Sequence, residues 1–216
     1  MNKRFTFILI ISIICMCVIV AVFCFLQKKP QRIYKFETIS QKIDVNCNDM
    51  IYGSDTAQLK IIMFATYNCR HCRNFLKLDF PHIKKEYIDS GKIQMIIKPI
   101  EISENPDMLS ALQLLLCMNS SGNADDINEL LLTQPSAIYS DDFRELIDDI
   151  INGNPDLAEC LMSDNFFTIK QNNNDYKALK TNLTPIFVIG NHFYVGRKKL
   201  AKFTQVIDYE MENINN

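Results

Sequence analysis

Residues 59–72 read LKIIMFATYNCRHC, an apolar run that leads directly into two cysteines separated by two residues. The run at residues 59–66 has the length and apolar character of a buried β-strand. Residues 70–90 then carry apolar side chains at helical spacing, with a kink expected near Pro81. A second strand is predicted at residues 93–97. The sequence therefore predicts a strand–helix–strand unit with a cysteine pair where the helix begins.

The spacing of the two cysteines suits disulfide exchange, which needs one accessible thiolate and a second thiol close enough to release a mixed disulfide. Cys69 stands at the predicted start of the helix, where unpaired N–H groups and the helix dipole favour negative charge and lower a thiol pKa. Cys72 lies one turn further on and is expected to be more buried. Arg70 and His71 lie between them and add positive charge. We therefore predict Cys69 as the nucleophile, Cys72 as the resolving thiol and His71 as a stabiliser of the thiolate.

After the strand–helix–strand unit, the sequence predicts a block of helices and then two more strands and a final helix. Short helices are predicted from about residue 105 to residue 176. A strand at residues 184–190 begins behind a proline, a return strand at residues 193–195 forms a hairpin with it, and a closing helix covers residues 198–213. The predicted order is thus strand, helix, strand, helical block, strand, strand, helix.

The composition favours disulfide chemistry over metal binding. The chain has 216 residues with 8 cysteines and 3 histidines. Three of these cysteines lie in an apolar N-terminal run, and the five beyond it contain a single close pair. Zinc would require two close pairs, or one pair with histidines at ligand spacing. We therefore expect no metal and no other cofactor, and an oxidising compartment in which disulfides persist. The formal net charge of −2 says little about partners, and no nucleic-acid partner is expected.

The N-terminal residues predict a membrane anchor. Phe5–Leu26 is a run of 22 residues with only Thr6 and Ser12 as polar members, long enough to span a hydrocarbon core of about 30 Å. This run is longer than the apolar core of a secretory signal, and no small-residue cleavage site follows it. An uncleaved signal anchor is therefore predicted at residues 1–27, followed by a stalk and arm at 28–55 and the main domain at 56–216.

Three stretches of the sequence resemble the DsbA family of thioredoxin-fold oxidoreductases, in its membrane-anchored bacterial form. The resemblance runs from about residue 50 to the C-terminus. It is carried by Tyr67-Asn68-Cys69-Arg70-His71-Cys72, by Phe80-Pro81 with Tyr87 to Ile93, and by Leu183-Thr184-Pro185-Ile186-Phe187-Val188-Ile189-Gly190. It implies an α/β thioredoxin fold with an all-helical insertion at about residues 101–176, between the βαβ and ββα halves, preceded by the transmembrane helix.

The resemblance also implies roles for particular residues. Pro185 would follow a cis peptide bond and face the cysteine pair, and Thr184 and Arg70 would join it in binding the substrate peptide. Cys117 and Cys160 would form a second, non-catalytic disulfide, and the pairing of Cys47 stays open. Two positions depart from the family pattern. DsbA-like enzymes commonly have proline where this chain has Arg70, and many thioredoxin-like proteins have an acidic residue where it has Met63. Proton transfer to and from Cys72 is therefore expected to use water or another group.

The function that the resemblance implies is a protein disulfide oxidase. The expected substrates are reduced or unfolded exported proteins, and the expected reoxidant is a DsbB-like, quinone-linked membrane partner. The chain would be a single-pass protein of the bacterial inner membrane with its catalytic domain on the periplasmic side. Two alternatives stay open: a reductase or isomerase, for example in cytochrome maturation, and a non-enzymatic thioredoxin-fold module that binds peptides.

Overall fold

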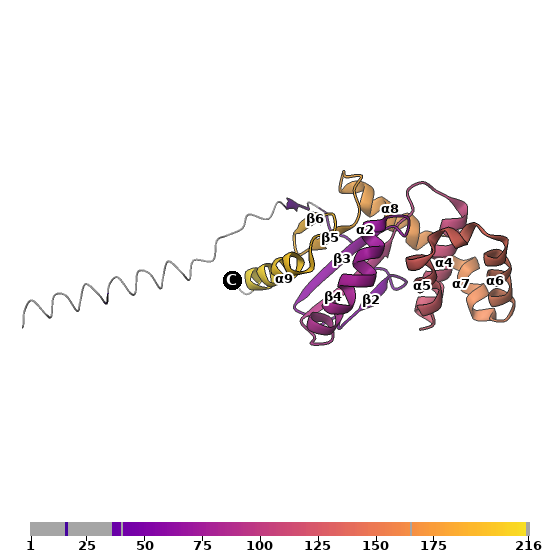
Figure 1. Cartoon of the computed structure of the whole chain (residues 1–216), viewed down its shortest axis with the longest axis horizontal. Helices are drawn as coiled ribbons and strands as arrows, with labels where there is room; N and C mark the ends of the chain where they lie inside the picture. The colour runs from indigo at the N-terminus through magenta and orange to yellow at the C-terminus, as the bar shows by residue number, and fades with distance from the viewer. Residues whose placement is uncertain (1–15, 17–35, 40, 165, 215–216) are drawn as a thin grey trace, which may run out of the picture. The chain divides into compact units, whose positions relative to one another are not determined.

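A mixed sheet of six strands forms the centre of the part of the chain that the computed structural model describes, which is residues 16, 36–39, 41–164 and 166–214 (Figure 1). Along the sheet the strands follow the order β1-β6-β5-β3-β4-β2. The central strand β3 pairs in parallel with β4 and antiparallel with β5. The strands are β1 (Glu37–Thr38), β2 (Met50–Tyr52), β3 (Leu59–Ala65), β4 (Ile93–Pro99), β5 (Ile186–Ile189) and β6 (His192–Val195).

A helix with two wide turns follows β3. Its consecutive segments are α2 (Arg70–Asn74), the π-helical η1 (Phe75–Asp79), α3 (Phe80–Ile83) and the π-helical η2 (Lys84–Ile88). The change of winding has a local cause, because Pro81 has no N–H to donate to the preceding turn, and the π turns lie on either side of it. The helix predicted at residues 70–90 is therefore present, and the irregularity expected near Pro81 takes the form of two π-helical turns.

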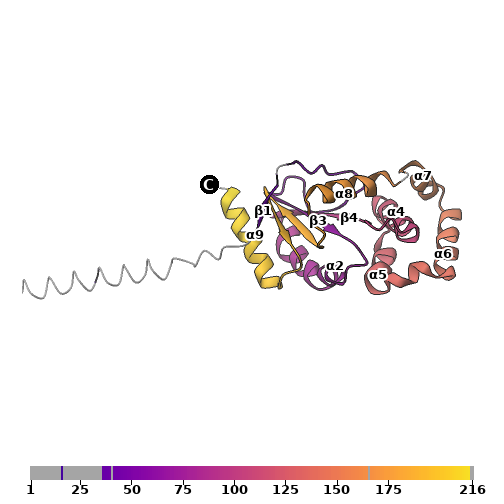
Figure 2. The ribbon, with the colours of Figure 1, turned by 90° about the horizontal axis from the view of Figure 1, so that it is seen from above.

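The two faces of the sheet are covered by different helices (Figure 2). On one face, Phe75 of η1, Phe187 of β5 and Phe203 of α9 (Leu200–Ile214) pack with ring centroids 4.6–5.2 Å apart. On the other face, Tyr176 of α8 (Phe167–Ala178) belongs to a buried cluster with Phe64 and other side chains. Successive residues of a strand point to opposite faces, so β3 and β5 supply apolar side chains to both layers.

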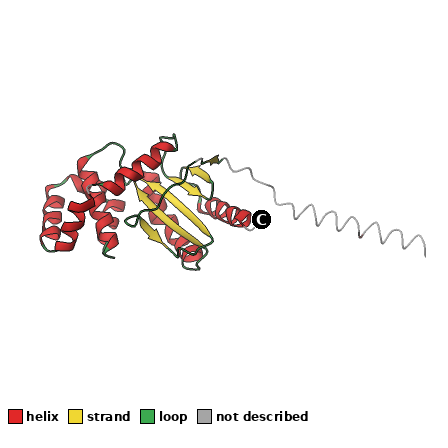
Figure 3. Ribbon diagram, turned by 180° about the vertical axis from the view of Figure 1, so that it is seen from behind, coloured by secondary structure: helices red, strands yellow, loops and turns green. Residues whose placement is uncertain are grey.

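A group of short helices is inserted in the chain between β4 and β5, and it lies to one side of the sheet (Figure 3). Three of its helices begin beside a side-chain cap, since Asn105 Oδ1 accepts from Met108 N, Ser140 Oγ accepts from Phe143 N and Asn154 Oδ1 accepts from Leu157 N. A disulfide between Cys117 and Cys160 joins α4 to α7, with the Cα atoms 5.9 Å apart. The helices of this group are α4 (Pro106–Ser120), α5 (Asp125–Thr133), the 3₁₀-helical η3 (Pro135–Tyr139), α6 (Asp141–Asn152) and α7 (Pro155–Asp164).

This architecture confirms the predicted thioredoxin-type fold with a helical insertion. Two strands were predicted too short, because β4 continues past residue 97 to Pro99 and β6 begins at His192 rather than at residue 193. The proposed anchor at Phe5–Leu26 lies outside the described residues, apart from Met16. Among the residues that are described, no helix combines the length and the apolar character that crossing a membrane requires. The domain boundaries at residues 27 and 55 stay predictions.

Candidate active site: a cysteine pair beside a cis-proline

The two cysteines lie at the junction between β3 and the helix that follows it. Cys69 directly precedes α2 in an extended conformation, with φ −82° and ψ 115°. Its N–H donates to the Thr66 carbonyl at 3.1 Å, and its own carbonyl accepts from Arg73 N at 3.1 Å. Cys69 is half-buried and Cys72 is fully buried, and both carry free thiols. The helix thus presents one accessible sulfur and keeps a second beneath it.

The peptide bond between Thr184 and Pro185 is cis, and it lies beside the cysteine pair. Cys69 Sγ is 3.6 Å from the Thr184 carbonyl oxygen, close enough for the S–H group to donate to it. The Pro185 carbonyl accepts from Gly196 N at 2.8 Å, so the loop after β6 supports this segment. Residues 115 positions apart in the sequence therefore form one site.

The surroundings of the two thiols drive their pKa values in opposite directions. For Cys69, burial raises the pKa, but hydrogen bonds from the Thr184 side chain, from Cys72 and from the His71 backbone outweigh this, so that the pKa lies below its ordinary value. For Cys72, burial and the negative charge of Cys69 raise the pKa to about 12. The pair therefore combines an outer sulfur that ionises easily with an inner sulfur that holds its proton.

The basic side chains near Cys69 act differently from the expectation. Arg70 and His71 are both exposed, and His71 favours the thiolate through its backbone N–H. Neither basic side chain is among the causes of the shift in the pKa of Cys69. Arg73, which the sequence did not single out, donates from Nη1 to the Tyr67 carbonyl at 2.6 Å and so holds the residues that lead into the site.

A second unpredicted contact joins this site to the helical insertion. Tyr67 is fully buried, and its hydroxyl donates to Asn128 Oδ1 of α5 at 2.6 Å. No local pattern could have paired these residues, because 61 positions separate them. The insertion therefore helps to fix the segment that carries Cys69.

The position that holds an acid in many thioredoxin-like proteins is occupied by the fully buried Met63. No carboxylate is among the groups that shift the pKa of Cys72. Within the described residues, no group of three or more His, Cys, Asp and Glu side chains could hold a metal ion. The chemistry that the two free thiols beside the cis peptide bond can carry out is the exchange of sulfur–sulfur bonds.

A C-x-x-C pair at a helix start, beside a cis-proline in a thioredoxin-type sheet, defines the class of thioredoxin-fold thiol–disulfide oxidoreductases. The chain belongs to the thioredoxin family whose model, Thioredoxin_4, matches residues 45–209. This match confirms the family resemblance found in the sequence.

Individual relatives agree with this assignment. The chain is 26% identical over 193 residues to a protein of Rickettsia conorii and 29% identical over 196 residues to one of Rickettsia prowazekii, both provisionally named as protein-disulfide oxidoreductases. The alignments cover 86% and 88% of this chain but only 68% and 65% of the relatives, so the chain spans about two thirds of their length. The crystal structure of Wolbachia pipientis alpha-DsbA1 superposes with a TM-score of 0.63 at 22% identity, over 77% of this chain and 92% of that one.

Proposed function

We propose that this protein is a disulfide oxidase of the DsbA type that donates the Cys69–Cys72 disulfide to reduced proteins. The observation that carries the proposal is the placement of Cys69 at the start of α2, beside the cis Thr184–Pro185 bond and above the buried Cys72, which lowers the pKa of Cys69 and raises that of Cys72. A stabilised Cys69 thiolate favours the reduced form of the pair, and a pair with a stable reduced form oxidises other thiols.

The exchange takes place in two substitutions at sulfur. A substrate thiolate attacks Cys69 Sγ, the Cys69–Cys72 bond breaks, and Cys72 leaves and takes up a proton, because burial raises its pKa. A second substrate thiolate then attacks the substrate sulfur of the mixed disulfide, and Cys69 leaves as the thiolate. The substrate loses two electrons and gains a disulfide, and the cysteine pair gains the two electrons.

The cellular setting is part of the same proposal. The substrates are reduced or unfolded exported proteins, and a DsbB-like, quinone-linked membrane protein removes the electrons from the reduced pair. The chain is held in the bacterial inner membrane by residues 1–27, with residues 56–216 on the periplasmic side. The Cys117–Cys160 disulfide supports this location, because structural disulfides persist mainly in oxidising compartments.

The direction of electron flow is tested by equilibrating the full-length chain with glutathione buffers and by assaying it on a reduced and on a scrambled substrate. We expect fast oxidation of the reduced substrate, no such activity for Cys69→Ser, and full activity for Cys47→Ser, which removes an exposed thiol outside the site. A reduction potential near that of thioredoxin, about −270 mV, together with reduction of substrate disulfides would instead establish a reductase. Efficient unscrambling without net oxidation would establish an isomerase.

A further inference from the structure

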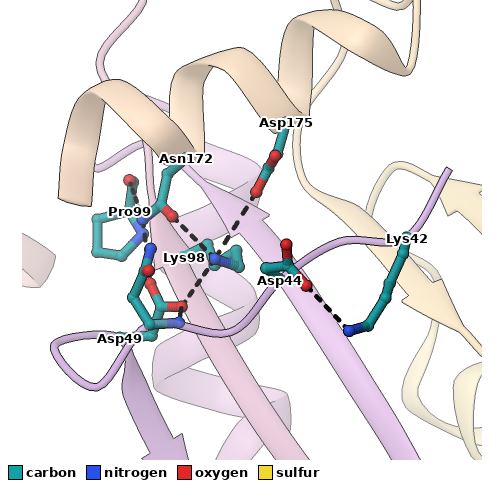
Figure 4. Close-up of polar contacts among 8 residues, drawn as sticks. Lys42, Asp44, Asp49, Lys98, Pro99, Asn172 and Asp175 are labelled. Carbon is teal, nitrogen blue, oxygen red and sulfur yellow. Dashed lines mark hydrogen bonds and ion pairs between the residues drawn. The ribbon is translucent and has the colours of Figure 1, made fainter. Parts of the chain in front are cut away.

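A buried lysine joins α8 to the sheet on the face opposite the cysteine-bearing helix (Figure 4). Lys98 of β4 is fully buried, with its ammonium 2.7 Å from Asp49 Oδ2, 3.0 Å from Asn172 Oδ1 and 3.9 Å from Asp175 Oδ2. The Asp49 side chain is also inaccessible to solvent. Burying a charged pair carries a large desolvation cost, and the pair persists only where its geometry is tightly held. The cluster therefore fixes α8 against β4 and against the loop that leads into β2.

Two asparagines of α8 strengthen this connection through the backbone after β4. Asn172 Nδ2 donates to Asp49 Oδ1 and to the Pro99 carbonyl, each at 3.2 Å. Asn173 accepts from Glu101 N at 3.0 Å and donates to the Glu101 carbonyl at 2.7 Å. Both asparagines are buried, so the position of α8 along the end of the sheet is set by specific hydrogen bonds as well as by apolar packing.

The next turn of α8 carries Tyr176, which contacts the cis-proline segment. Its hydroxyl donates to the Leu183 carbonyl at 3.4 Å, one residue before Thr184. Its ring is almost completely buried and lies 6.2 Å from that of Phe64. The pKa of Tyr176 is raised, first by burial and then by its electrostatic interaction with Cys72 and Cys69.

We propose that Tyr176 is a positioning residue for peptide substrates: through the Leu183 carbonyl its hydroxyl holds the Thr184–Pro185 segment in place beside Cys69. The proposal rests on the exchange function proposed above. A peptide joined to Cys69 by a mixed disulfide must lie alongside Thr184, because Cys69 Sγ is only 3.6 Å from the Thr184 carbonyl. A small dithiol needs access to the sulfur alone and does not depend on this support.

The test is Tyr176→Phe in the full-length chain, which removes the hydroxyl and keeps the ring that packs against Phe64. We expect kcat/KM for oxidation of a reduced dithiol peptide to fall about three- to tenfold, the effect of losing one neutral hydrogen bond, mainly through KM. The rate at which dithiothreitol reduces the Cys69–Cys72 disulfide should stay unchanged. Tyr87→Phe is the matched control, because it removes a hydroxyl that bonds to Asp208 of α9 outside the site, and both of its rates should equal those of the wild type.

Each outcome is decisive. An unchanged kcat/KM for the peptide in Tyr176→Phe would overturn the positioning role. An equal loss of the peptide rate and the dithiothreitol rate would also overturn it, because a general disturbance of the site would lower both. If the wild-type chain fails to oxidise the peptide, the exchange function itself fails and the positioning role fails with it.

Discussion

Replacing the buried Lys98 by methionine would measure how strongly the structure depends on an ion pair that is shielded from water. The side chains of Lys98 and Asp49 are both 0% exposed, and their charged atoms are 2.7 Å apart. Methionine keeps most of the aliphatic stem and removes the ammonium, which leaves the Asp49 carboxylate buried with its charge uncompensated. Breaking a buried pair in this way costs about 3–5 kcal/mol of unfolding free energy. At about 2–4 °C per kcal/mol for a domain of this size, Tm should fall by about 6–20 °C.

Thermal unfolding followed by circular dichroism, together with urea titration, would measure this loss. The double variant Lys98→Met with Asp49→Asn removes both charges of the fully buried pair, and it should recover most of the lost stability because the remaining carboxylate, Asp175, is partly exposed to solvent. Lys60→Met on β3 is the surface control, since Lys60 is exposed and its replacement should change stability by no more than about 0.5 kcal/mol. If the Tm of Lys98→Met stays within about 2 °C of the wild type, the reasoning is refuted, because removing one charge of a buried pair should lower the free energy of unfolding by much more than that shift implies.

Three further changes test other parts of the structure. Thr184→Val removes a hydroxyl that lowers the pKa of Cys69, so the pKa should rise and the rate of Cys69 alkylation at pH values below it should fall, as a pH series with iodoacetamide would show. The double variant Cys117→Ser, Cys160→Ser opens a loop closed across 43 residues and should lose up to about 4 kcal/mol in urea unfolding while keeping its exchange activity. Tyr67→Phe breaks the hydrogen bond to α5 and should lower stability by about 1 kcal/mol in the same assay.

The sequence predicted most of the fold because its signals are local. The apolar run before Cys69, the helical pattern around Pro81 and the strand behind Pro185 each indicate an element from neighbouring residues alone. The positions of the two cysteines at a helix start follow from the same local signals.

The contacts that stabilise the site could not be predicted, because they join residues far apart in the chain. Lys98 lies near the end of β4 after several apolar residues, and nothing near it indicates that a carboxylate 49 positions earlier or an asparagine 74 positions later would pair with it. Tyr176 likewise gave no signal that its hydroxyl would reach the cis-proline segment. A single sequence predicts periodicity and turns, and pairings of this kind become visible only when the elements are packed.

The arginine at position 70 shows why a departure from a family pattern can leave the chemistry intact. The backbone donors that lower the pKa of the Cys69 thiol are the N–H groups of His71 and Cys72, and residue 70 contributes neither of them. A proline at position 70 would supply no N–H of its own, so exchanging proline for arginine leaves this set of donors unchanged. Arg70 itself is exposed to solvent, next to the half-buried Cys69. The thiolate is thus stabilised by the Thr184 and Cys72 side chains and by the backbone at the helix start, and the side chain at position 70 takes no part in it.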